Sequence, residues 1–162
     1  MYRQGAAGAL LDIYEQAIGG LKKVIEDIAD EALAIIIDPV TSDDNCRSIQ
    51  AILSHVVHSG YGYATSIYNL KQHYLKRPDK SFYITIKEYL QDLDGVFIFT
   101  ETVFKDIKDT ELEQPDNSLK IEAPWDQVYD IEQMMEHAIV HILRHKRQIE
   151  KFKLKGFDII KK

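Results

Sequence analysis

Histidines are the residues whose spacing most clearly indicates chemistry in this sequence. Five of the six lie in two short windows, at His55, His58, His137, His141 and His145. Neutral imidazole nitrogens bind divalent metal ions such as zinc at about 2.0–2.1 Å. Two histidines four residues apart on a helix face the same way, with Cβ atoms about 6 Å apart, so both rings can reach one ion. The two windows therefore predict a metal site built from two helices.

Helical geometry limits which of these histidines can share an ion. His137 and His145 are separated by about 12 Å along a helix axis, so they cannot both bind the same ion. The pair is therefore either His137 with His141 or His141 with His145, and the spacing leaves both pairs open. In the other window, His55 lies on the apolar stripe of its helix and His58 points about a turn away. The third ligand is therefore expected to be His55.

The residues around the histidines argue against other chemistries. A zinc protease motif needs a Glu directly after the first His of the pair, but Ile142 follows His141. Di-iron bundles use Glu three residues before a His, and no histidine here has one. Cys46 has no evident base beside it and stands in a predicted loop. A three-histidine site remains the leading hypothesis.

Four segments with helical periodicity must position these histidines. They run from about Ala7 to Ile37, from an N-cap within Thr41–Asp44 to about His73, from Phe82 to about Ile107, and from an Asp126 N-cap to just before Gly156. The third segment starts with β-branched and aromatic residues that also suit a strand, but its later spacing favours a helix. Residues 109–124 lack a helical period and form a long connection. We therefore expect an all-α, antiparallel four-helix bundle with one long crossover connection, formed as a single domain by residues 1–162.

Composition narrows the classes of function. The chain of 162 residues is 45% apolar, enough for one continuous core. Its net charge of −6 argues against nucleic acid as a partner. The longest apolar run outside the N-terminus, Ala32–Ile37, is too short for a membrane span. Cys46 is alone, which favours the cytoplasm over a disulfide-forming compartment.

Basic residues gather near the end of the fourth segment. They are Arg144, Lys146, Arg147, Lys151, Lys153 and Lys155. Positive charge is favourable near the C-terminus of a helix, where the backbone carbonyls have no helical partner. We interpret the cluster as a solvated helix end.

Two stretches of the sequence resemble the DinB/YfiT-like superfamily of metal-dependent bundle proteins. The first is Ile52-Leu53-Ser54-His55-Val56-Val57-His58, which looks like the ligand motif of that family's second helix. The second is the His-x-x-x-His pattern from His137 to Ile149, similar to the fourth-helix motif that ends in Arg-Gly-Gln-Ile. Lys146-Arg147 stands here in place of the usual Arg-Gly, and Arg144 replaces a His often found before the last ligand. Neither departure removes a ligand.

The resemblance implies the metal ligands and the kind of activity. It assigns the ligand roles to His55, His141 and His145 and leaves His137 outside the site. Relatives of this kind bind nickel, zinc or iron, are often homodimers, and in some branches act on low-molecular-weight thiols. The leading hypothesis is thus a metal-dependent hydrolase or thiol transferase that acts on a small molecule.

Two questions stay open within the sequence. The first is whether the chain is an enzyme at all, because the alternative is a non-catalytic dimeric or stress-associated module whose metal is structural or vestigial. The second is which residues would act as acid or base. Glu136 and Tyr61 are the nearest candidates, although surface exposure or core packing is the simpler interpretation of both. No catalytic residue is assigned.

Overall fold

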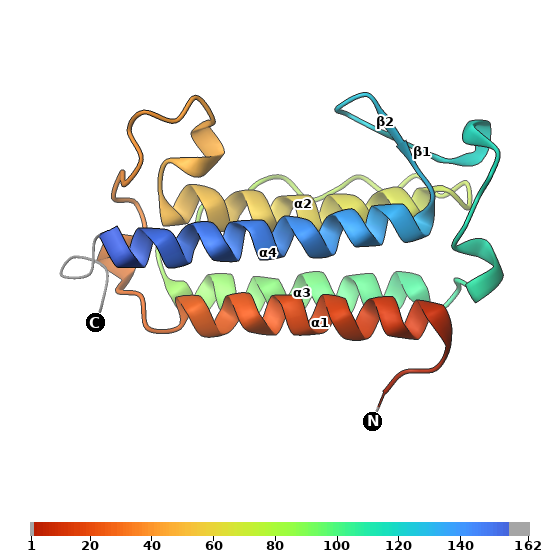
Figure 1. Cartoon of the computed structure of the whole chain (residues 1–162), viewed down its shortest axis with the longest axis horizontal. Coiled ribbons are helices and arrows are strands. Elements are labelled where there is room, and N and C mark those ends of the chain that lie inside the picture. Colours follow the sequence, from red (N-terminus) through yellow and green to blue (C-terminus); the bar gives the residue numbers. More distant parts are fainter. Residues whose placement is uncertain (1, 156–162) are drawn as a thin grey trace.

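The computed structural model describes residues 2–155, in which four long helices form a bundle (Figure 1). The helices are α1 (Gly5–Ile25), α2 (Ile49–Asn69), α3 (Ile86–Phe104) and α4 (Ile131–Lys155). Four 3-10 turns occur at Asp30–Ala32, Asp44–Cys46, Asp109–Glu111 and Asn117–Leu119, and a small hairpin pairs β1 (Ile121–Ala123) with β2 (Gln127–Tyr129). The all-helical bundle expected from the periodicity is confirmed.

Fully buried side chains from all four helices form one core, with Leu21, Ile52, Leu93 and Ile149 as examples. Each lies on the apolar stripe of its helix, so burial of these stripes is what holds the bundle together. Among the residues that the structure describes, no helix has the length and apolarity needed to cross a bilayer.

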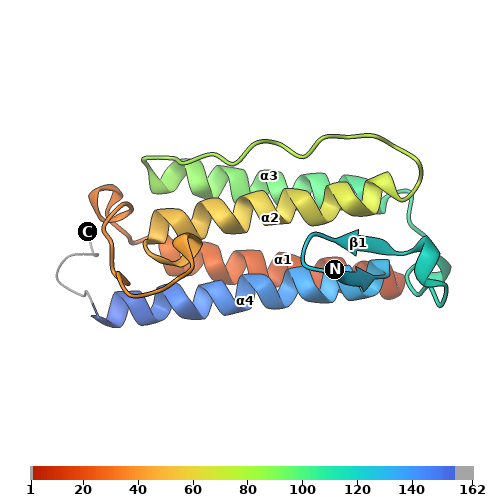
Figure 2. The same cartoon turned by 90° about the horizontal axis from the view of Figure 1, so that it is seen from above.

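Neighbouring helices pair in both directions. Helices α2 and α4 are antiparallel, since His55 contacts His141 and Tyr63, farther along α2, contacts His137. Helices α2 and α3 run parallel, because Ser54 contacts Tyr89 and Tyr61 contacts Phe99. By the same kind of evidence α1 is antiparallel to α3 and parallel to α4 (Figure 2).

The crossover connection is residues 70–85, which run the length of the bundle from the end of α2 to the start of α3 (Figure 2). Hydrogen bonds fix its later part: Gln50 donates to the Tyr83 carbonyl, the Tyr83 hydroxyl to Asp92, and Lys80 to Asn45. The sequence suggested residues 109–124 for the long connection, but this segment stays at one end of the bundle, where it folds into turns and part of the hairpin. Because α2 and α3 are parallel, the chain must return along the bundle between them, and residues 70–85 form this return.

Helix α1 ends at Ile25, twelve residues before the end expected from the periodicity. The apolar spacing continues because Ile28 and Leu33 are buried, but their segment is held by tertiary hydrogen bonds. Gln50 donates its backbone N–H to the Leu33 carbonyl, and the Asp30 carboxylate accepts the N–H of Ile86 at the start of α3. The first bond satisfies a carbonyl that a longer α1 would have paired internally, and the second satisfies an unpaired N–H at the start of α3.

Two helix starts differ from the expected ones. The N-cap of α2 is Ser48, whose hydroxyl accepts the N–H of Ala51, while Asp43 caps the preceding 3-10 turn. The N-cap of α4 is Asp130, which exchanges two hydrogen bonds with Gln133. Asp126 instead lies in the turn between β1 and β2, with a positive φ of 59°. In both observed helix caps, Ser48 and Asp130, a side-chain oxygen accepts the backbone N–H of the residue three positions later.

One further boundary departs from its expected range, and another lies outside the described residues. Helix α3 begins at Ile86, after a capping box formed by Thr85 and Glu88, and the described chain from Phe82 to Thr85 is neither helix nor strand. Helix α4 is described to Lys155, so its proposed stop before Gly156 lies outside the described residues.

Candidate metal centre

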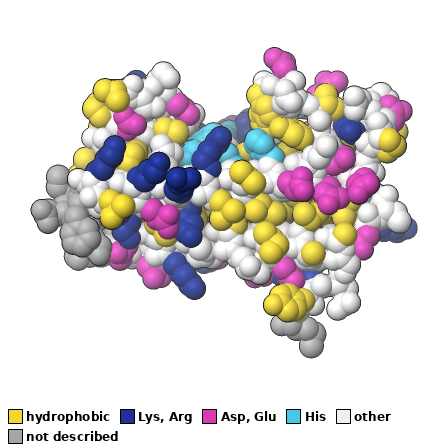
Figure 3. All heavy atoms as spheres, viewed as in Figure 1, with side chains coloured by type: hydrophobic (Ala, Val, Ile, Leu, Met, Phe, Trp, Pro, Cys, Tyr) yellow, Lys and Arg dark blue, Asp and Glu magenta, His cyan; other side chains and the backbone are white. Residues whose placement is uncertain are grey.

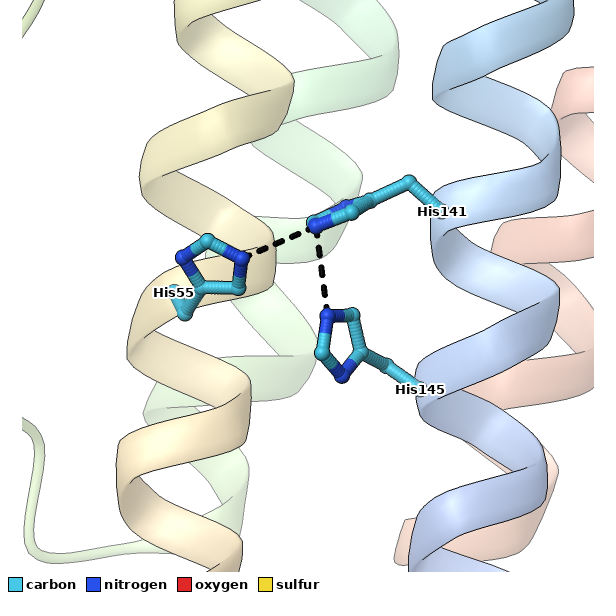
Figure 4. Close-up of side chains that lie close together, drawn as sticks. All are labelled: His55, His141 and His145. Atoms are coloured by element: carbon cyan, nitrogen blue, oxygen red, sulfur yellow. Dashed lines mark hydrogen bonds between the residues drawn. The ribbon is translucent and has the colours of Figure 1, made fainter. Parts of the chain in front are cut away.

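Three histidine rings converge between α2 and α4 (Figure 4). His55 comes from α2, and His141 and His145 come from successive turns of α4. The Nε2 atom of His141 lies 2.9 Å from Nε2 of His55 and 3.2 Å from Nε2 of His145. One ring nitrogen from each residue therefore falls within 4.8 Å of the other two.

This arrangement fits a metal ion. Three ligand nitrogens that surround a tetrahedral ion at about 2.0–2.1 Å are separated from each other by about 3.3 Å. The Nε2 atoms of His141 and His145 lie close to that separation, and those of His141 and His55 are slightly closer together. Three nitrogens gathered this closely cannot all carry hydrogens toward one another, whereas one ion would accept all three lone pairs. Zinc, nickel and iron all accept such a set, so the donors do not select the metal.

Burial keeps the three imidazoles neutral, which is the form that binds metal. Desolvation lowers the pKa of His55 to about 4, with smaller contributions from the positive charges of His145 and Lys80. Desolvation also lowers the pKa of His141 and that of His145. His141 and His145 are 5% and 3% exposed, so little water reaches either ring.

The rings on α4 are oriented in different ways. The Nδ1 of His145 lies 3.1 Å from Oε1 of Gln148, so an Nδ1–H donated to this oxygen leaves the Nε2 lone pair facing the other rings. The Nδ1 of His141 is buried and has no hydrogen-bond partner among the described residues. Tyr63 packs its ring edge-on against His141, at 5.8 Å between centroids. Hydrogen bonding thus orients one ring, and packing orients the other.

The other two clustered histidines lie outside the triad. His137 stacks on Trp125, with ring centroids 5.0 Å apart and an angle of 20° between the ring planes. His58 faces the crossover connection, in a small pocket that it shares with Pro78 and Asp92. The structure thus brings His55, His141 and His145 together and leaves His58 and His137 outside this cluster.

The suggested acid and base candidates do not reach the triad. Glu136 is exposed on α4, where it lines a surface pocket with Glu132 and Lys120. The hydroxyl of Tyr61 donates to Asp92 of α3 at 2.9 Å. Sequence reasoning did not single out Gln148 or Tyr63 as neighbours of the ligands. Gln148 could have been found from its position three residues after His145, one turn along the same helix.

A cavity of about 650 Å³ opens beside the triad, between α4 and the loop that precedes α2. His55 and His145 form part of its wall. The remaining lining residues are Asp38, Asp43, Cys46, Arg144, Arg147, Gln148, Lys151, Phe152 and Lys155. A small molecule in this cavity would lie against two of the three converging histidines.

The fold and the site together define a four-helix bundle with a crossover and a three-histidine cluster that could hold a metal ion. The family model described as the DinB family matches residues 1–151, and the chain belongs to this family. The resemblance seen in the two histidine segments is thereby confirmed. Comparisons with curated proteins and with solved structures found no match.

Proposed function

We propose that this protein is a metal-dependent enzyme in which His55, His141 and His145 hold one divalent ion, with nickel, zinc and iron as the candidates. The observation that carries the proposal is the position of the triad, because two of its histidines line a cavity large enough for a small-molecule substrate. A purely structural metal site would be expected to be closed by a fourth protein ligand. No fourth His, Cys, Asp or Glu joins the cluster among residues 2–155.

The chain contributes binding and orientation to the proposed reaction. The buried imidazoles offer neutral nitrogens, and Gln148 fixes the ring of His145. An ion held by three histidines, when bound, supplies a Lewis acid that can activate water or a thiol as a nucleophile. The cavity then holds the substrate against His55 and His145. The reaction class supported by these features is hydrolysis or thiol transfer on a small molecule, with a low-molecular-weight thiol as one candidate substrate.

The protein is further proposed to be a cytoplasmic homodimer. A lone cysteine suits a reducing compartment. Exposed apolar side chains occur on the adjacent helices α1 and α4, where Ile13, Val140 and Leu143 are 49%, 61% and 46% exposed. Figure 3 shows hydrophobic side chains gathered over these helices. Sedimentation of the parent and of Val140→Glu tests this assembly, since a charge within an apolar interface would favour the monomer.

The metal proposal is tested by elemental analysis of protein purified without chelators. We expect about one ion per chain in the parent and none in His141→Ala/His145→Ala, since one remaining imidazole cannot retain an ion through purification. His137→Ala is the matched control, because it removes a neighbouring histidine of α4 that lies outside the triad. Equal metal contents in the parent and the double variant would contradict the site.

Catalysis is tested separately with the metal-loaded proteins. Thiol-transfer and hydrolytic substrates are screened on the parent, His137→Ala and the double variant. Turnover by the first two alone would support an enzyme. A fully loaded parent that turns over none of these substrates, and that unfolds when the metal is removed, would instead indicate a structural ion.

A further inference from the structure

The cavity beside the triad has a strongly basic wall. Arg144, Arg147, Lys151 and Lys155 line it from α4, against two carboxylates from the loop before α2. Figure 3 shows dark-blue side chains gathered next to the cyan histidines on this face. The whole chain carries a net charge of −6, so this local excess of positive charge runs against the overall balance.

Within the part of the chain that the structure describes, the cations of the wall differ from Lys146 and Lys153 of α4 in having no acidic partner. Lys146 lies 3.7 Å from Glu150, and Lys153 forms an ion pair with Asp27. Within the described residues 2–155, Arg144, Arg147 and Lys151 form no such pair. The helix thus has paired lysines on its other faces and unpaired cations on the cavity face. These cations are exposed, as in a solvated helix end, and in addition they line the cavity beside the triad.

The two carboxylates of the cavity already have local partners. Asp43 accepts the backbone N–H and the side-chain amide of Asn45, at 2.9 and 3.0 Å. Asp38 accepts the N–H groups of Val40 and Thr41. These bonds hold the loop in its conformation. The basic side chains opposite are therefore available to an anion from solution.

We infer that the substrate of this centre is an anionic small molecule, whose carboxylate or phosphate group binds Arg147 and Lys151 while its reactive group lies at the triad. The inference rests on the proposed function and adds the chemical class of the substrate. Arg147 and Lys151 follow His145 by two and six residues, about 3 and 9 Å along the helix axis. The anionic end and the reactive end of the substrate are thus separated by a few bonds. Arginine and lysine side chains provide charge-assisted hydrogen bonds to such groups.

The inference is tested with two thiols of similar size on the cobalt(II)-substituted parent, after free metal has been removed. Mercaptosuccinate carries two carboxylates, and 1-thioglycerol carries two hydroxyls. Binding is followed by the thiolate-to-cobalt absorption band. We expect mercaptosuccinate to bind at least about tenfold more tightly, because charge-assisted hydrogen bonds are roughly twice as strong as neutral ones. The preference should decrease as salt screens the charges.

The variant Arg147→Gln/Lys151→Gln removes the proposed anion contacts without touching a histidine. We expect it to lose most of the preference for mercaptosuccinate while its affinity for 1-thioglycerol changes less than about twofold, as expected for exposed charges that act only on an anion. Lys105→Gln is the control for loss of a distant surface charge, because Lys105 is exposed at the opposite end of the bundle, beyond α3. Equal affinities for the two thiols in the parent, or an unchanged preference in the double variant, would overturn the inference.

A separate arm distinguishes failure of the inference from failure of the proposed metal centre. Succinate and inorganic phosphate, which lack a thiol, are titrated into metal-free parent and into the double variant by calorimetry. If cobalt does not bind, the metal centre fails. Saturable binding of either anion that is lost in Arg147→Gln/Lys151→Gln would then still support the anion site, and its absence would overturn it. The stronger binder of the two indicates whether the natural group is a carboxylate or a phosphate.

Discussion

On the hairpin side of the triad, the rings of Tyr63 and His137 pack near His141, and Trp125 covers His137 from β1–β2. On the loop side, Gln148 hydrogen-bonds His145, and a cavity with basic side chains opens toward solvent. The same three histidines thus face an aromatic wall in one direction and a polar cavity in the other. The aromatic wall can only position a ring, whereas the polar side can orient a ligand and receive a substrate.

This difference assigns separate tasks to the two sides. The aromatic side contributes desolvation, which favours the neutral imidazole of His141. The loop side contributes a directed hydrogen bond and access from solution. Changes on the loop side should therefore alter metal or substrate binding, and changes on the hairpin side should mainly alter the stability of the fold. The predictions below test this division, starting with the largest effect.

Replacement of Gln148 by Leu removes the acceptor that orients His145. Partners of this kind are typically worth about 10–100-fold in metal affinity, so we expect a loss in that range. The measurement is competition against a chelating indicator with the purified, metal-free protein. Gln148→Glu is the matched variant, because a carboxylate retains an acceptor oxygen and should retain tight binding. If the Leu variant binds metal as tightly as the parent, the loop side does not orient the ligand.

The sequence predicted the features of the fold that depend on local apolar spacing, but not those that depend on contacts between distant segments. Apolar spacing located all four helices, because the stripes of α1–α4 are buried in one core. Spacing did not locate the end of α1, since Ile28 and Leu33 keep a helical rhythm while their segment is held by bonds to Gln50 and Ile86. The direction of the crossover was likewise set by long-range packing of α2 against α3.

For the candidate site, the sequence identified the residues and tertiary structure supplied their surroundings. His141 and His145 could be found because helix periodicity places them on one face, and His55 because it lies on an apolar stripe. In the sequence, only the family resemblance excluded His137. In the structure, the antiparallel register of α2 and α4 places His137 away from His55. Tyr63 and the loop residues of the cavity wall could not be identified, because they reach the triad from α2 and from the loop before it. The basic residues of α4 were found in the sequence, but not their position beside the triad.

Acidification tests whether His55, in the wall of the cavity, is as desolvated as the structure indicates. His55 has a pKa of about 4 in the folded state, against about 6.5 in an unfolded chain. Between these values the unfolded state binds more protons, so the free energy of unfolding of the metal-free protein should decrease as the pH falls. Each such histidine contributes a slope of at most about 1.4 kcal/mol per pH unit.

Urea unfolding of metal-free protein at several values from about pH 7 to 5.5, above the range in which ordinary carboxylates titrate, measures this slope. His55→Gln should have a shallower slope than the parent. His73→Gln is the control, since His73 lies outside the triad at the start of the exposed crossover connection, where it stacks on Tyr68. Identical slopes in His55→Gln and the parent would show that water reaches His55 freely, and the loop side would then be an open surface.

The smallest effect is expected on the hairpin side. Trp125 is 41% exposed and contacts His137, Tyr63 and Tyr129, but none of the triad. Trp125→Ala should lower the free energy of unfolding by about 1 kcal/mol, the typical value of such aromatic pairs. Metal affinity should stay within about threefold of the parent, because the residue touches no histidine of the triad and provides no hydrogen bond to one.

Tyr129→Phe is the control, because it removes only the hydroxyl that accepts the Trp125 indole N–H and so separates the hydrogen bond from the ring contacts. A tenfold loss of metal affinity in Trp125→Ala would mean that the aromatic wall also sets the ligand geometry, and the two sides would then share one task.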